Sequence, residues 1–254
     1  MERPINWENP DMHARNASVA IIGAGDYIGS EIAKKFASEG FIIHAGRRGG
    51  VKLKPLFDEI IEAGGRARGR SLDARNPDDV TAFLAEAEAL APLELCIFNV
   101  GANVQFPILE TTDRVFRKSW EMACFAGFVT GREAARIMLA RGRGKIFFTG
   151  ATASLRGGAG YAAFASAKFG IRAVAQAMAR ELWPQNIHVA HLIIDAGVDT
   201  QWVRELIASR QGSDLPGALS ADGLMPPAAV ANAYWALFEQ SADAWTLEKV
   251  RRAF

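Results

Sequence analysis

Residues 18–29 read SVAIIGAGDYIG, and this stretch decides the fold. Ser18–Gly23 is a short apolar run that ends at a glycine, which predicts a buried strand. Tyr27–Glu39 has apolar residues at helical spacing, so we expect a helix directly after the strand. The glycines at 23, 25 and 29 are spaced Gly-x-Gly-x-x-x-Gly between these two elements. The stretch therefore predicts a strand, a tight glycine loop and a helix in immediate succession.

A glycine loop at such a junction suits the binding of a dinucleotide. Without side chains, the backbone N–H groups approach a pyrophosphate closely, and the N-terminus of the helix adds positive potential. The alternative is a tight structural turn without a ligand, but the position between a first strand and a first helix favours a nucleotide-binding loop. The residues that we expect to bind the cofactor here are Gly23, Gly25, Tyr27, Ile28 and Gly29.

Strand-like and helix-like segments alternate along the rest of the chain. Further strands are predicted at 41–45, 67–72, 93–100, 145–149 and 187–194, with a short last one within 245–250, and helices at 52–63, 78–90, 112–140 and 161–183. The strands are continuous apolar runs, as in a parallel sheet that is covered on both faces. The chain therefore predicts an α/β fold with a doubly wound parallel β-sheet between two helical layers.

We expect one domain over residues 1–254, with an N-terminal extension at 1–16. Residues 212–227 are rich in Gly, Pro, Ser and Asp. We interpret the region from about 200 to 227 as a substrate loop or lid, the alternative being a surface connection without a gating role.

Composition excludes several classes of function. Half of the 254 residues are hydrophobic and the formal net charge is +1, which gives no support for nucleic-acid binding. No apolar run approaches the roughly 20 residues needed to span a membrane, and no signal peptide is evident. Cys96 and Cys124 are expected to be buried free thiols of a cytoplasmic protein, and no His, Cys or carboxylate cluster has the spacing of metal ligands.

The residues at the end of the second predicted strand indicate whether the cofactor is NAD or NADP. A carboxylate there would accept hydrogen bonds from the ribose hydroxyls of NAD, but the chain has Gly46-Arg47-Arg48-Gly49. Two guanidinium groups suit a 2′-phosphate, so Arg47 and Arg48 favour NADP(H) over NAD(H). The alternative is that both arginines are solvated loop charges. Asp26 in the glycine loop is an objection, because proteins with a similar loop that prefer NADP often carry a basic residue there.

Further motifs resemble the short-chain dehydrogenase/reductase family. Gly160–Lys168 (GYAAFASAK) is similar to its active-site helix, and matches extend from Val19 to Thr200. The resemblance implies a Rossmann fold in which Asp73 contacts adenine, Asn99 and Gly101 line the cofactor, and Thr200 reaches the nicotinamide carboxamide. It also implies that Lys168 holds the ribose.

Three of the four catalytic positions of that family are altered. The family uses Asn, Ser, Tyr and Lys, and on this resemblance Cys124 stands at the Asn, Ala151 at the Ser and Phe164 at the Tyr, with only Lys168 kept. Phe has no hydroxyl, so the usual acid/base is missing. Thr149 lies on the same side of its predicted strand as Ala151 and is a candidate to replace the serine hydroxyl in part.

Tyr161 is the candidate substitute for the missing tyrosine. Tyr161, Phe164 and Lys168 share one helical face at i, i+3 and i+7. The spacing Tyr-(x)6-Lys is similar to the enoyl-thioester reductase branch of the superfamily, where the tyrosine binds a thioester carbonyl. The glycine loop departs from that branch, and a tyrosine at this place also occurs in ordinary members.

Two functions therefore remain open at the level of sequence. The first is an NADP(H)-dependent oxidoreductase that transfers hydride to or from a small carbonyl, alcohol or enoyl substrate. The alternative is a catalytically impaired homologue that binds the nucleotide and acts as a sensor or partner subunit. The resemblance also implies a homodimer or homotetramer built on the long helices at 112–140 and 161–183.

Overall fold

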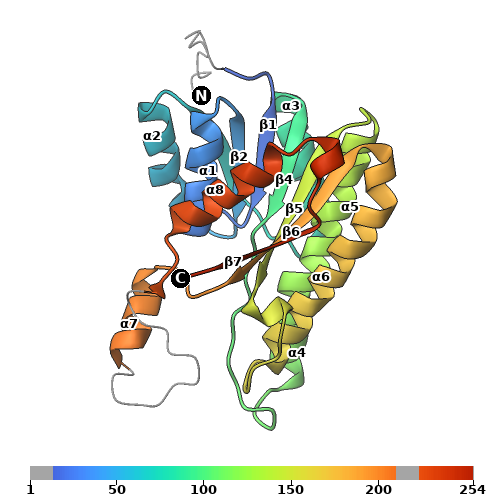
Figure 1. Ribbon diagram of the computed structural model, residues 1–254. Helices are drawn as coiled ribbons and strands as arrows, with labels where there is room; N and C mark the ends of the chain where they lie inside the picture. The colour runs from blue at the N-terminus through green and yellow to red at the C-terminus, as the bar shows by residue number, and fades with distance from the viewer. Residues whose placement is uncertain (1–13, 210–222, 254) are drawn as a thin grey trace.

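Seven parallel strands form one sheet in the computed structural model, which describes residues 14–209 and 223–253 (Figure 1). Their order across the sheet is β3-β2-β1-β4-β5-β6-β7. The strands are β1 (Ser18–Ile22), β2 (Ile42–Arg47), β3 (Arg66–Ser71), β4 (Leu93–Phe98), β5 (Gly144–Ala151), β6 (Ile187–Asp195) and β7 (Glu248–Arg252).

Helices cover both faces of this sheet, which confirms the predicted three-layer α/β fold (Figure 1). One layer contains α1 (Ile28–Ser38), α2 (Lys54–Glu62) and α8 (Pro227–Phe238), and the other contains α3 (Pro77–Leu90), α5 (Ala126–Leu139) and α6 (Ala162–Leu182). Two further helices, α4 (Asp113–Trp120) and α7 (Gln201–Ser209), extend beyond the carboxyl ends of the strands.

Alternation along the central strands explains why these strands are largely apolar, whereas the edge strands β3 (RARGRS) and β7 (EKVRR) are rich in charged residues and do not fit the predicted apolar runs. In β1, Val19 and Ile21 pack in the layer of α1 and α8, whereas Ala20 and Ile22 pack in the layer of α3 and α5. All four are at most 1% exposed. Both faces of β1 are thus removed from water, and hydrophobic side chains are required at successive positions.

The order of the strands places a crevice at the carboxyl ends of β1 and β4. The chain runs outward from β1 through β2 to β3, and then returns to the other side of β1 with β4. At such a switch point the loops after two neighbouring strands turn in opposite directions, which leaves room for a ligand between them.

The structure differs from the predicted elements in three places. The helix predicted at 112–140 is divided into α4, a π-helical turn at Glu121–Phe125, and α5. Residues 201–209 of the predicted lid region form α7, and α8 was not foreseen. The last strand begins at Glu248 rather than at 245.

Some predictions lie outside the described residues. Most of the N-terminal extension belongs to residues 1–13, and the centre of the lid region belongs to residues 210–222. Across the described parts of the chain, no helix has the length and apolar character needed to cross a membrane.

Candidate nucleotide-binding and active site

A cleft of about 340 Å³ opens at the carboxyl ends of β1, β2 and β4. Its walls contain ten residues from the glycine loop, the loop after β2 and the loop after β4: Gly23, Gly25, Gly46, Arg47, Arg48, Gly49, Lys52, Asn99, Val100 and Gly101. The turn after β3 completes it with Asp73, Ala74 and Arg75. Most of the predicted cofactor residues are therefore brought to one cleft.

The three glycines of the loop are needed for different reasons. Gly23 has a φ of +95°, and a Cβ atom there would lie 2.6 Å from the carbonyl oxygen of Asn99. A Cβ on Gly29 would lie 2.6 Å from the Cα of Ala24, so the loop packs directly onto the start of α1. A Cβ on Gly25, in contrast, would meet no protein atom within 4 Å. Gly25 thus keeps a space clear in the cleft wall that a phosphate group fits.

The start of α1 is also suited to an anion. No side chain among the described residues caps its N-terminus at Tyr27. The N–H of Ser30 in its first turn donates to the carbonyl of Gly25, which leaves the N–H groups of Ile28 and Gly29 for a ligand. The Tyr27 hydroxyl accepts a hydrogen bond of 3.3 Å from the backbone N–H of Gln201, while Ile28 packs against the core. Thr200 accepts a 3.1 Å hydrogen bond from the N–H of Val203 and so begins α7. The glycine loop and the start of α7 therefore lie against each other.

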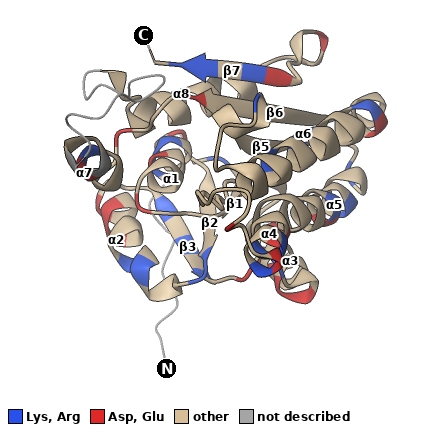
Figure 2. Ribbon diagram, turned by 90° about the horizontal axis from the view of Figure 1, so that it is seen from below, with Lys and Arg blue, Asp and Glu red and all other residues tan. Residues whose placement is uncertain are grey.

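Four basic residues line the cleft, namely Arg47, Arg48, Lys52 and Arg75. Figure 2 shows basic residues on β2, on β3 and near the start of α2. Arg47 forms an ion pair with Asp26, and Arg75 forms a bidentate pair with Asp73 at 2.9 and 2.5 Å. Arg75, and more weakly the charge of Arg48, holds the pKa of the Asp73 carboxyl below its usual value. The part of the cleft that these four residues line is cationic and suits a phosphate better than a sugar hydroxyl.

Hydrogen bonds of Asn99 and Thr149 connect the glycine loop to the end of β4 and to β5 beneath the cleft. Asn99 donates a 3.0 Å hydrogen bond to the carbonyl of Gly23, and the Thr149 hydroxyl donates one of 2.9 Å to Asn99. Thr149 also lies 2.6 Å from the hydroxyl of Tyr234, whose pKa is raised above its ordinary value by burial. This arrangement argues against Thr149 as a replacement for the serine hydroxyl, because the group is buried and has two partners.

Lys168 is buried at the junction of the cleft and the predicted catalytic positions. Its side chain is on α6, it is 3% exposed, and burial lowers the pKa of its ammonium group to about 8. The ammonium donates hydrogen bonds of 2.9 Å to the carbonyl of Thr149 and 3.2 Å to the carbonyl of Val100. Because Val100 lines the cleft, Lys168 lies directly behind the wall of the cleft.

The residues that the family resemblance places at altered catalytic positions lie together. Phe164 and Cys124 belong to a small buried cluster, and Ala151 and Tyr161 pack against it. The centre of the Phe164 ring is 5.9 Å from the Lys168 nitrogen, which allows a cation–π interaction. Burial raises the pKa of the Cys124 thiol, so it is a poor proton donor. The cluster therefore forms an apolar wall beside one buried ammonium group.

Sequence reasoning did not find two contributions to the site. Tyr234 comes from α8, and its link to Thr149 has no local signal in the sequence. Arg75 is separated from Asp73 by one residue, and this spacing could have indicated their ion pair.

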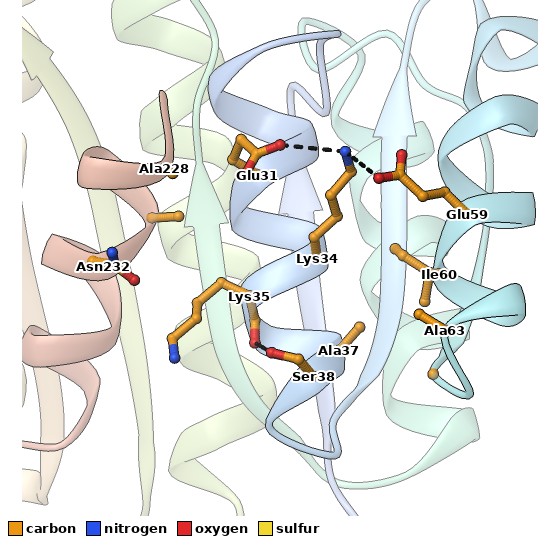
Figure 3. A pocket seen from close by; sticks show the side chains of 12 residues that line it. Glu31, Lys34, Lys35, Ala37, Ser38, Glu59, Ile60, Ala63, Ala228 and Asn232 are labelled. Atoms are coloured by element: carbon orange, nitrogen blue, oxygen red, sulfur yellow. Dashed lines mark hydrogen bonds and ion pairs between the residues drawn. The ribbon is translucent and has the colours of Figure 1, made fainter. Parts of the chain in front are cut away.

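A second hollow of about 350 Å³ lies between α1, α2 and α8 (Figure 3). Lys34 bridges Glu31 and Glu59 across it at 3.3 and 2.6 Å, and Lys35 pairs with Glu39. Its charged groups thus already have partners. Within residues 14–209 and 223–253, no group of three His, Cys, Asp or Glu is arranged to hold a metal ion.

The fold and the glycine-loop cleft define a protein of the Rossmann dinucleotide-binding class. A family model described as short chain dehydrogenase matches residues 17–211. The chain belongs to this short-chain dehydrogenase family.

The comparisons with individual proteins agree with this assignment. The crystal structure of a short-chain dehydrogenase from Rhodopseudomonas palustris is 66% identical, covers 94% of this chain and all of that one, and superposes with a TM-score of 0.82. An NADPH-dependent 1-acyldihydroxyacetone phosphate reductase of Saccharomyces cerevisiae is 25% identical over 72% of this chain but only 62% of its own length. The 3-oxoacyl-[acyl-carrier-protein] reductase MabA of Mycobacterium bovis is 27% identical over 74% of this chain and 72% of its own.

Proposed function

We propose that this protein is an oxidoreductase that uses NADP(H) and a small substrate with a carbonyl, alcohol or enoyl group. The position of Lys168 carries the proposal. Its ammonium lies between the nucleotide cleft, which it reaches through Val100, and the apolar wall that contains Phe164. A buried lysine without a carboxylate partner costs folding free energy, so its retention favours a role toward a ligand.

The cleft supports the choice of the phosphorylated nucleotide. The backbone of the glycine loop would hold the pyrophosphate, Asp73 would face the adenine, and Arg48 would meet the 2′-phosphate. Lys168 would hold the ribose next to the nicotinamide, with Thr200 near the carboxamide. When bound, the nicotinamide supplies or accepts the hydride. The NADPH dependence of the yeast relative supports this choice.

The apolar wall limits which substrates suit the site. Reduction of a ketone needs a proton donor at the oxygen, and Phe164, Ala151 and Cys124 provide none that is effective. Hydride addition to a conjugated carbon–carbon double bond forms an enolate, which one hydrogen-bond donor stabilises. Tyr161, at the edge of the cluster, and the ammonium of Lys168 are the donors for this role. We therefore propose enoyl compounds as the first substrates to test.

We further propose that the protein is a homo-oligomer of the cytoplasm. Exposed aromatic side chains on α4, α5 and α6 support self-association, and both cysteines are free and buried. Persistent free thiols are typical of a reducing compartment.

A titration and a turnover assay test the proposed function together. Wild-type protein is titrated with NADPH and NADH, and NADPH consumption is followed with enoyl thioesters, enones and ketones. Lys168→Ala is expected to weaken NADPH binding and abolish turnover, whereas Lys54→Ala, which removes an exposed lysine of α2, is expected to leave both unchanged. Tight NADPH binding without turnover of any substrate would favour the impaired homologue instead. Binding of neither nucleotide would overturn the proposal.

A further inference from the structure

The glycine loop contains a carboxylate that forms an ion pair with one of the two consecutive arginines at the end of β2. Asp26 follows Gly25 directly, and its side chain pairs with the guanidinium of Arg47. The Asp26 side chain is 63% exposed and that of Arg47 is 20% exposed, so the pair lies at the rim of the cleft that Arg47 lines. The loop that would hold the pyrophosphate thus also neutralises a cation suited to the 2′-phosphate.

Arg48 and Lys52 remain available in the same part of the cleft. Both line it, and neither has a carboxylate within 4.0 Å in the parts of the chain that the structure describes. The charge of Arg48 nevertheless acts on Asp73 across the cleft. The two consecutive arginines are therefore not equivalent, because Arg47 has a carboxylate partner among the described residues and Arg48 has none there.

We propose that Asp26 sets the coenzyme preference by withholding Arg47 from the 2′-phosphate, so that Arg48, assisted by Lys52, is the residue that recognises it. This inference rests on the proposed function. A carboxylate and a phosphate compete for one guanidinium, and the carboxylate also repels a nearby dianionic phosphate. Asp26 therefore lowers the affinity for NADP(H) and leaves the affinity for NAD(H) unchanged. It thereby reduces the ratio of the two affinities, and so the preference for NADP(H).

Replacement of the carboxylate by an amide tests this directly. Dissociation constants of NADPH, NADH, 2′,5′-ADP and 5′-AMP are measured for the wild type and for Asp26→Asn. We expect NADPH and 2′,5′-ADP to bind about three- to tenfold more tightly to the variant, as for an exposed ion pair. We expect NADH and 5′-AMP to change by less than about twofold. The gain is expected to shrink at high salt, since the charges are exposed.

A matched control separates this effect from a general change in charge. Asp58 forms a similar exposed pair with Lys54 on α2 and does not line the cleft. Asp58→Asn removes the same charge and is expected to leave all four dissociation constants unchanged. Asp26→Ser is a second variant in case the amide forms a new contact.

A double-mutant cycle tests whether Asp26 acts through Arg47. In the wild type, Arg48→Ala is expected to cost more NADPH affinity than Arg47→Ala. In the Asp26→Asn background, Arg47→Ala is expected to cost about three- to tenfold more than in the wild type. Equal costs in both backgrounds would overturn the inference, as would an Asp26→Asn effect that is the same for NADPH and NADH. Wild-type protein that binds neither nucleotide would overturn the proposed function and this inference with it.

Discussion

Lys168 combines two properties that seldom occur together in a lysine. Its ammonium is almost completely buried, and within residues 14–209 and 223–253 its hydrogen-bond partners are two backbone carbonyls rather than a carboxylate. Carbonyl oxygens and the face of the Phe164 ring stabilise the charge only in part, so burial is the main influence on its pKa. The residue is therefore held near the point where it loses its proton, which suits a group that must respond to a ligand.

The lowered pKa of Lys168 predicts that stability rises with pH. Below pH 8 the lysine is charged in both the folded and the unfolded state, and folding bears the full cost of burying the charge. Between about 8 and 10.5 only the unfolded state keeps the proton, so the free energy of unfolding increases by up to about 3 kcal/mol. Urea unfolding at pH 7, 8, 9 and 10 measures this. Lys168→Met, which does not titrate, is expected to lack the increase, and equal pH profiles for the two proteins would contradict the assignment.

Restoring two side chains is expected to create ketone reduction. Phe164→Tyr adds a hydroxyl beside the Lys168 ammonium, whose charge lowers the pKa of a phenol, and Ala151→Ser supplies a hydroxyl for the substrate oxygen. We expect the double variant to reduce ketones about 10²-fold faster than the wild type. NADPH oxidation with aromatic and aliphatic ketones measures the rate, and Phe164→Leu with Ala151→Ser is the control that lacks the acid. No gain in a variant that still binds NADPH would show that Phe164 does not occupy the acid position.

At the scale of the element, two glycines of the loop have different roles: Gly29 is needed for folding and Gly25 for binding of the nucleotide. A Cβ on Gly29 collides with the backbone of the loop, whereas a Cβ on Gly25 meets no protein atom. We therefore expect Gly29→Ala to lower the free energy of unfolding by about 2 kcal/mol or more. We expect Gly25→Ala to unfold like the wild type and to bind NADPH about tenfold more weakly, because its methyl group enters the space for the phosphate. Thermal unfolding and nucleotide titration of both variants test this, and normal NADPH affinity in Gly25→Ala would place the pyrophosphate elsewhere.

Local patterns predicted the central strands of the sheet well, because their sequences are largely apolar; the edge strands β3 (RARGRS) and β7 (EKVRR) carry no such apolar run. The same patterns missed the division of the helix at 112–140. The π-helical turn at Glu121–Phe125 has no helix-breaking residue, and Cys124 packs there so closely to α6 that a Cβ on Gly170 would lie 2.6 Å from its sulfur. Such a contact between helices cannot be read from one segment alone. The link from Thr149 to Tyr234 was missed for the same reason.

In the site, too, motifs of neighbouring residues could be predicted from the sequence, whereas contacts between distant residues could not. The glycine loop and the arginines after β2 were found because their chemistry is carried by neighbouring residues. The Asp26–Arg47 pair joins residues 21 positions apart, so the sequence raised Asp26 as an objection without showing its partner. Where two charged residues meet depends on the twist of the sheet and the length of the loops, which composition and spacing do not contain.

At the scale of the whole molecule, three buried histidines predict sensitivity to acid. Burial lowers the pKa values of His44, His188 and His191 to about 4, 4 and 3. Above pH 6.5 they are neutral in both states, but from pH 6.5 down to about 4 only the unfolded state gains the protons, so stability falls as the pH falls. Neither ring nitrogen of His191 has a hydrogen-bond partner in the part of the chain that the structure describes, so His191→Leu leaves no polar group there unpaired. Urea unfolding between pH 7 and 5 is expected to show a weaker loss in this variant, and an unchanged slope would contradict the prediction.

The two helical layers differ in how well they are covered, and this predicts where a second copy binds. Phe116 and Trp120 of α4, Phe128 of α5 and Phe169 of α6 are each 38–42% exposed. Trp120 and Phe125 stack, and Trp120 approaches Gly170, so these aromatic rings form one band across α4, α5 and α6. Large apolar patches on a protein surface mark interaction sites, and the burial of each ring contributes about 1.5–3 kcal/mol.

We expect this aromatic band to hold a homodimer together, and a charge within it to separate the copies. Phe128→Asp with Phe169→Asp places two carboxylates in each copy of the interface, where they are buried without partners and repel one another. Light scattering after gel filtration is expected to give a dimer or a tetramer for the wild type and a smaller assembly for this variant. Ile61→Asp is the control, because Ile61 is a similarly exposed apolar residue on α2, in the opposite layer. A monomeric wild type, or a variant with unchanged mass, would show that the band serves another purpose.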